Sequence, residues 1–162
     1  MPRLTLLALA SLLTLAAAPG LSAGEPSIDQ QIQMVRSLTE AQREATVALN
    51  VELTTAESDK FWPIYRDYRN DVAKLNDERV AIIKDFAANF DSLTNDKAKS
   101  LIRESLDNQK ARDALKAKYV GKFEKVLPAI KAARVMQLEN KLDALIDVTL
   151  AVSIPLALPP SS

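Results

Sequence analysis

Apolar residues recur every seven positions through the middle of the chain, as they do along one face of a long α-helix. The main series comprises Phe61, Tyr68, Leu75 and Ile82. A companion series comprises Tyr65, Val72 and Phe86, and it is broken at Arg79. A seven-residue repeat that continues over several heptads indicates a long helix packed against another helix. We expect this helix to begin at Thr54 and to end near Asp91.

Capping residues divide the remaining sequence into further helices. Ser27 and Gln30 form a capping box before a first helix, which is expected over residues 28–49. Thr94 is the expected N-cap of a third helix. Pro128 suits the first turn of a fourth helix, because its missing N–H costs little there. The predicted fold class is therefore all-α, with four helices.

The second and third helices are expected to form a long central antiparallel hairpin, because a loop of only about three residues separates them. Pro63 lies inside the second helix, where it removes an N–H and crowds the carbonyl of Asp59. We therefore expect a bend at Pro63. We predict a single helical domain over residues 25–152. Residues 153–162 contain three prolines and are expected to form a tail that cannot continue the last helix.

The first residues follow the order of a secretory signal peptide. Arg3 supplies a positive charge, residues 4–18 are apolar apart from three hydroxyl residues, and small and turn residues follow as far as Gly24. The apolar run is shorter than the roughly 20 residues that a spanning helix needs, which favours a signal peptide over an uncleaved anchor. We expect a signal peptide over residues 1–23, cleavage between residues 20 and 25, and a periplasmic mature chain.

Composition excludes many kinds of active site. The 162 residues include no His and no Cys, so the chain has no Ser-His-Asp triad, thiol nucleophile, disulfide or zinc finger. Its three glycines are too scattered for a phosphate-binding loop. Adjacent carboxylates such as Asp77 and Glu78 do not face one another on a helix. We predict a protein that is not an enzyme and that holds no cofactor and no metal.

Charge is balanced overall but unevenly distributed along the chain. Residues 25–59 hold seven acidic and two basic residues, whereas residues 110–134 hold eight basic and two acidic residues. A basic run of this kind is usually a solvated helix face. It also suits a face that attracts acidic partners or anionic lipid head groups at a membrane surface, or one on which the acidic first helix docks. No nucleic-acid partner is expected, because no aromatic loop pattern accompanies the run and an exported protein rarely meets nucleic acid.

Several of the predicted helices open with Leu-Thr. These openings begin at Leu38, Leu53 and Leu93, and Leu127-Pro128 is a degenerate fourth. One explanation is mechanical, because leucine supplies a hydrophobic staple and threonine an N-cap.

The openings also resemble the LTxxQ motif of the Spy/CpxP-like periplasmic proteins, over about residues 50–145. The residues that carry the resemblance are Leu53, Thr54, Glu57, Leu127 and Lys131. Neither aligned copy has the glutamine of the motif. Leu38, Thr39 and Gln42 match it literally but lie outside the expected place. The run 61–65 and the pair 127–128 look more like a set of uncharacterised exported bacterial proteins of similar length.

The resemblance implies a bent helical hairpin that dimerises into a shallow cradle. In that family, the cradle binds unfolded proteins without ATP or modulates an envelope-stress sensor. We accordingly expect an exported chaperone-like protein or stress adaptor, a homodimer, whose partners are unfolded or stress-sensor proteins. The alternative is a structural helical spacer of the envelope that forms an oligomer and binds no client protein.

The candidate client-binding residues lie in the basic run and beside Pro63. They are Lys116, Lys118, Tyr119, Lys122, Phe123 and Trp62. Positive charge speeds the encounter with a partner, and dispersed apolar contacts hold many sequences weakly. The competing interpretation of the lysines is a solvated helix face. The competing interpretation of Trp62 is a core aromatic residue at the helix bend.

Overall fold

The structure of the protein, a computed structural model, describes residues 40–158. This part of the chain forms a first helix over residues 40–50, then α2 (Thr55–Ala88), α3 (Asn95–Phe123) and α4 (Ala129–Ser153), and it contains no strand. A short 3-10 helix, η1 (Phe90–Ser92), lies between α2 and α3. The predicted all-α fold class is confirmed. The expected signal peptide, the first part of the helix expected over residues 28–49, and residues 159–162 lie outside the described residues.

The N-terminus of α2 is fixed by the predicted cap. The hydroxyl of Thr54 accepts the backbone N–H of Glu57 at 3.3 Å, and the Glu57 carboxylate accepts the N–H of Thr54 at 2.8 Å. This reciprocal pair satisfies two N–H groups that have no partner within the helix. Thr94 caps α3 by accepting the N–H of Lys97 at 3.2 Å. Local sequence therefore determines where both long helices begin.

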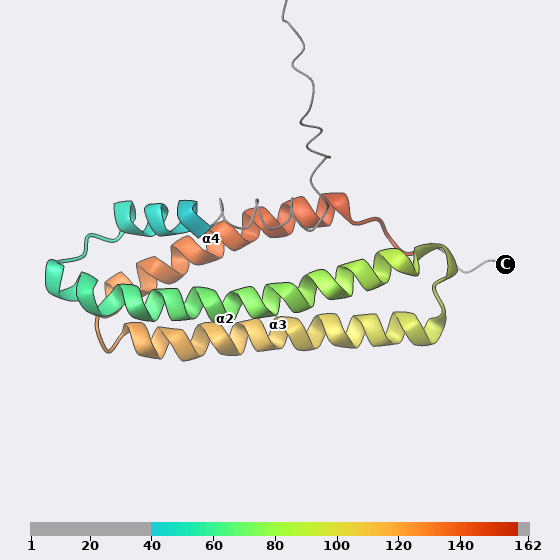
Figure 1. Ribbon diagram of the computed structural model, residues 1–162, viewed down its shortest axis with the longest axis horizontal. Helices are drawn as coiled ribbons and strands as arrows, with labels where there is room; N and C mark the ends of the chain where they lie inside the picture. Colours follow the sequence, from blue (N-terminus) through green and yellow to red (C-terminus); the bar gives the residue numbers. More distant parts are fainter. Residues whose placement is uncertain (1–39, 159–162) are drawn as a thin grey trace, which may run out of the picture.

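Helices α2 and α3 lie side by side and run in opposite directions (Figure 1). Halfway along α2, the hydroxyl of Tyr119 donates to Asp71 at 2.8 Å. One turn further along α2, the amide of Asn108 donates to the carbonyl of Leu75 at 2.8 Å. We call the end where α2 begins the proximal end and the end that contains η1 the distal end. α2 continues through Pro63 as a helix, and the expected bend there stays a prediction.

The core is concentrated at the proximal end. Its buried aromatic rings belong to Phe61, Tyr65, Tyr68, Tyr119 and Phe123. Neighbouring centroids in this group lie 5.2–6.3 Å apart in tilted or edge-on arrangements, as aromatic pairs prefer. Aliphatic side chains complete the core, namely Val47, Val51, Val72, Leu127, Ala132 and Val135. Leu75 and Ile82 continue the predicted series but are only half-buried, so the hairpin is less well covered toward its distal end.

Candidate functional site

A buried cluster of charges joins the helices near the proximal core. Its centre is Glu139 of α4, whose side chain is fully buried. One oxygen of Glu139 accepts hydrogen bonds from Arg43 at 2.9 Å and Arg69 at 2.8 Å. The other accepts the hydroxyl of Tyr65 at 2.6 Å. One carboxylate therefore holds side chains from the first helix and from α2 against α4.

Asp143 lies one turn after Glu139 and extends the cluster. It accepts a hydrogen bond from Arg43 at 2.8 Å, and it pairs with Lys116 at 3.0 Å and Arg112 at 3.5 Å, both on α3. The two carboxylates of α4 thus neutralise cations from the first helix, α2 and α3. We call this set the charge cluster, comprising Glu40, Arg43, Tyr65, Arg69, Arg112, Lys116, Glu139 and Asp143.

Glu40 closes the charge cluster at the first helix. Its two carboxylate oxygens accept from Nε and Nη2 of Arg69 at 2.8 and 2.5 Å, a two-point contact that fixes the guanidinium plane. Burial by itself lowers the pKa of Arg69, but the hydrogen bonds from Glu40 and the charge of Glu139 outweigh it and raise that pKa. Arg69 is therefore charged at any pH at which the protein folds.

Two buried polar atoms beside the cluster have no hydrogen-bond partner among the described residues. They are Nε of Arg43 and the hydroxyl of Tyr68. Burial, together with the charges of Glu139 and Asp143, raises the pKa of the Tyr68 phenol, so this side chain is a neutral donor. One unpartnered atom therefore belongs to a charged guanidinium of the cluster, and the other belongs to a neutral phenol beside it.

Asp143 gives the stability of the protein a pH dependence. Burial by itself raises the pKa of Asp143, but the hydrogen bond from Lys116 and the neighbouring guanidinium groups outweigh it. The net pKa lies below the ordinary value of 3.8. A carboxyl with a depressed folded pKa contributes stability above its unfolded pKa, and this contribution is lost as the pH falls through the folded pKa.

We expect the free energy of unfolding to fall as the pH drops below about 4, and to fall less in the Asp143→Asn variant. Urea denaturation of both proteins at neutral pH and in acid measures the two decreases. Glu57 and Asp71 also have lowered pKa values, but both proteins contain them, so their effect cancels in the comparison. Equal decreases in the two proteins would contradict the assignment to Asp143.

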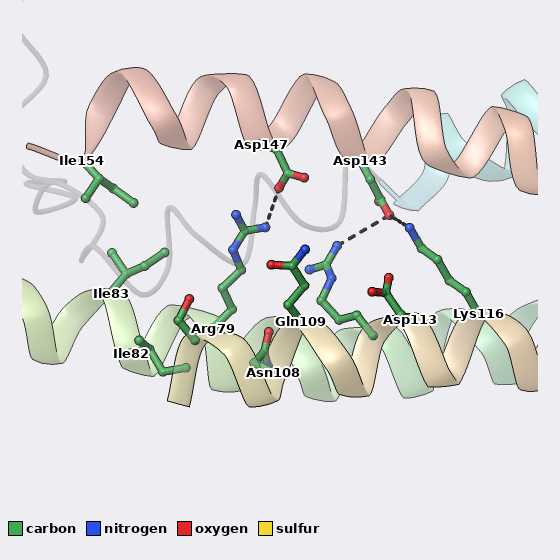
Figure 2. A pocket seen from close by; sticks show the side chains of 12 residues that line it. Arg79, Ile82, Ile83, Asn108, Gln109, Asp113, Lys116, Asp143, Asp147 and Ile154 are labelled. Carbon is green, nitrogen blue, oxygen red and sulfur yellow. Dashed lines mark hydrogen bonds and ion pairs between the residues drawn. The ribbon is translucent and has the colours of Figure 1, made fainter. Parts of the chain in front are cut away.

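A cleft of about 380 Å³ lies between α2, α3 and α4 beside Asp143 (Figure 2). On its polar side, Arg79 of α2 donates to Asp147 of α4 at 2.6 Å. Arg112 and Lys116 also face the cleft, and both pair with Asp143. Each of these three cations already has a carboxylate partner. The cleft is therefore a poor site for an anion.

An apolar groove of about 340 Å³ lies at the distal end, and we call it the distal groove. It is lined by Ile82, Ile83, Phe86, Leu101, Ile102, Ser105, Leu106 and Ile154. Ile102 and Leu106, one turn apart on α3, are 61% and 62% exposed. Large apolar side chains that gather in the open are typical of surfaces that bind other molecules.

The comparisons with known proteins give no family for this chain. No family model, curated protein or solved structure matches it. The resemblance to the Spy/CpxP-like proteins therefore stays a prediction, as do export, the absence of enzymatic activity and the homodimer. Within residues 40–158, none of the helices is both long and apolar enough to cross a bilayer. The same residues contain no group of three or more acidic side chains placed to hold a metal ion.

The structure separates the candidate client-binding residues into core and surface groups. Tyr119 and Phe123 are 2% and 0% exposed and belong to the proximal core. Burial, with the hydrogen bond to Asp71, raises the pKa of Tyr119 to about 12. Trp62 is half-buried, with its ring 5.1 Å from that of Phe61. A partner that approaches the folded surface can reach part of Trp62, whereas the other two rings are covered.

The three candidate lysines have different surroundings. Lys116 is part of the charge cluster and also donates to Asn140 at 2.9 Å. Lys118 and Lys122 lie over the ring of Tyr119, with their nitrogens 5.2 and 4.4 Å from its centroid. Cation–π contacts of this kind at a surface leave the charge accessible to solvent. Lys118 also pairs with Asp71 at 3.7 Å, although its side chain is 56% exposed. Lys118 and Lys122 are therefore the more accessible lysines of this set.

The charge cluster was not among the features predicted from the sequence. A usable signal was present, because Glu139 and Asp143 are one turn apart within the apolar series of the fourth helix. Arg69 likewise lies between the core positions Tyr68 and Val72. Charged residues on a core-facing stripe must be paired when they are buried. The pattern indicates burial but does not identify partners that are 70 or more positions away along the chain.

Proposed function

We propose that this chain is an exported, ATP-independent chaperone-like protein or stress adaptor that binds apolar segments of unfolded or stress-sensor proteins. The observation that carries the proposal is the distal groove, where apolar side chains of α2 and α3 remain open to solvent. Weak contacts spread over such a groove suit partners of many sequences. A periplasmic location and a homodimer belong to the same proposal.

Positive charge beside the distal groove supports the same function. Lys99 lies three residues before Ile102, and Lys110 lies four residues after Leu106, so both share that side of α3. Both lysines are exposed. Exposed lysines therefore flank the apolar groove along α3, although Lys99 also pairs with Asp96 at 3.7 Å. The sequence suggested such a combination of apolar contact and positive charge, but at a different place on α3.

Aggregation of an unrelated enzyme during heating tests the proposal, with light scattering as the readout. We expect the wild-type chain to suppress the aggregation and the double variant Ile102→Ser/Leu106→Ser to lose most of this effect. Both side chains are exposed, so their replacement should change stability by only about 0.5 kcal/mol each. The matched control is Leu49→Ser/Ile130→Ser, which removes two other exposed aliphatic side chains, 83% and 78% exposed.

If the control variant suppresses aggregation and the groove variant does not, the result would support binding at the distal groove. Equal suppression by both variants would place binding elsewhere on the protein. If the wild-type chain suppresses nothing, the structural spacer becomes the better explanation.

A further variant, Lys118→Glu/Lys122→Glu, tests whether the proximal lysines speed capture of the unfolding enzyme at low salt. Lys116 is left unchanged because a carboxylate there would face the buried Asp143.

A further inference from the structure

A pocket of about 210 Å³ lies where the four described helices meet, and we call it the arginine pocket. Its apolar residues belong to the distal parts of α2 and α4 and are Val80, Ile83, Ile146 and Leu150. Its polar residues, most of which lie toward the proximal end, are Glu40, Arg43, Arg69, Asn76, Arg79, Arg112 and Asp143. Ile146 is 39% exposed, so the apolar wall is reachable from solvent. Apolar walls combined with gathered polar groups are typical of small-molecule sites.

The arginine pocket carries more positive than negative charge. Its lining holds four arginines and two carboxylates, whereas the lining of the cleft beside Asp143 holds three cations and three carboxylates. Glu139 and Asp147, from outside the lining, neutralise part of this excess, and Lys116 shares Asp143. Among residues 40–158, the five cations of this network therefore meet four carboxylates. One positive charge is left, and a ligand with a single negative charge would neutralise it.

Arg112 and Arg43 are the cations of the pocket whose interactions are least complete. Arg112 lies 3.5 Å from Asp143, which Arg43 and Lys116 approach more closely, at 2.8 and 3.0 Å. A further partner of Arg112 is the neutral amide oxygen of Asn76. Nε of Arg43 is buried and has no hydrogen-bond partner among the described residues. Because buried charged groups need partners, these two guanidinium groups favour an added carboxylate.

We propose that the arginine pocket binds a small aliphatic monocarboxylate, whose carboxylate pairs with Arg112 and whose chain packs against the apolar wall. The volume of 210 Å³ equals that of about seven water molecules at about 30 Å³ each. Since bonded atoms lie closer together than separate waters, the pocket accommodates roughly ten non-hydrogen atoms, as in octanoate. This inference goes beyond the proposed function, because it requires neither the distal groove nor a client protein.

Isothermal titration calorimetry of the wild-type protein with sodium octanoate tests the site. We expect one octanoate to bind per chain. The affinity should rise about two- to fourfold for each methylene added between butanoate and octanoate, because the apolar wall buries the chain. Acetate, which has the charge without the chain, and 1-octanol, which has the chain without the charge, should each bind at least tenfold more weakly than octanoate, as expected when the ion pair or the apolar contact is lost.

Two variants, each with a matched control, locate the ligand. Arg112→Gln should weaken octanoate binding roughly tenfold or more, because a charge-assisted hydrogen bond is lost. Its control is Arg103→Gln, which removes an exposed arginine from the same helix and should bind like wild type. Ile146→Ser should weaken octanoate binding about three- to tenfold through lost apolar contact. Its control is Leu145→Ser, the neighbouring residue on α4, which is 67% exposed and outside the lining.

Absence of octanoate binding, or equally tight binding of 1-octanol, would overturn the proposal. Equal affinities of Ile146→Ser and Leu145→Ser would also overturn it, and this comparison holds even if Arg112→Gln fails to fold, which circular dichroism checks. The groove variant Ile102→Ser/Leu106→Ser should bind octanoate like wild type, because neither residue lines the arginine pocket. A loss of octanoate binding in that variant would place the ligand in the distal groove and overturn the assignment.

Discussion

Replacement of Glu139 by alanine is expected to lower the free energy of unfolding by about 3–5 kcal/mol, the usual cost of removing one partner from a buried ion pair. The carboxylate of Glu139 is fully buried and accepts from Arg43, Arg69 and Tyr65. Its removal leaves two guanidinium groups inside the protein with one fewer acceptor. The loss is larger than the pair's net contribution to stability, because it includes the cost of the stranded charges.

Urea denaturation followed by circular dichroism measures this loss. The matched control is Glu44→Ala, which removes an exposed glutamate from the first helix and should change stability by less than about 0.5 kcal/mol. An unchanged dependence of the unfolding free energy on urea in both variants would show that the transition itself is the same. A loss for Glu139→Ala no larger than for the control would mean that the charge cluster contributes nothing measurable.

The second large effect is expected at Phe123, where substitution by alanine should destabilise the protein by about 3–5 kcal/mol. Phe123 has no exposed surface, and its ring lies 5.3 Å from that of Phe61 and 6.0 Å from that of Tyr68. The space left by the ring lies between α2 and the end of α3, where rigid neighbouring rings limit collapse.

The control for Phe123 is Phe90→Ala at the distal end. Phe90 is half-buried and its ring contacts that of Phe86 at 5.6 Å, so less packing is lost there. We expect the loss at Phe90 to be less than half of that at Phe123. Equal losses would contradict the concentration of the core at the proximal end.

The start of each long helix could be predicted from the sequence because caps are local. Thr54 and Thr94 each satisfy an N–H three residues ahead, and both act as expected. The predicted C-terminal ends of the helices were less accurate. The second helix was expected to reach Asp91, but α2 ends at Ala88 and a 3-10 turn follows. Asn89 causes this, because its side chain bonds back to Asp85 and competes with the helical pattern.

The polar stretch of the third helix illustrates what the sequence could not reveal. Apolar periodicity is lost around residues 107–113, yet Asn108 is buried there and donates to the carbonyl of Leu75. Arg112 in the same stretch donates to Asn76 of α2 at 2.7 Å and pairs with Asp143 of α4. Helix α3 therefore contacts its neighbours through polar groups at this point, and a hydrophobic pattern does not register such contacts.

Part of the chain's unevenly distributed charge is neutralised by ion pairs within the fold. Lys131 of the basic run pairs with Glu57 at 2.7 Å, and Lys116 pairs with Asp143. Glu40 of the first helix pairs instead with Arg69 of α2, outside the basic run. The partners could not be assigned from charge totals, because each pair depends on which helix faces which. The distal groove could not be predicted either, because burial also depends on which helix faces which. Ile82 lies on the predicted core face, yet it is only half-buried.

The position of the charge cluster has a consequence for hydrogen exchange. Separation of any one of the four described helices from the proximal end exposes unpaired charges in the others, so these helices should open together and exchange their amides only through global unfolding. At the distal end, half-buried aliphatic contacts permit local opening, and protection should decline along α2 from Tyr65 toward Phe86. One rigid end would then anchor a groove whose walls fluctuate independently.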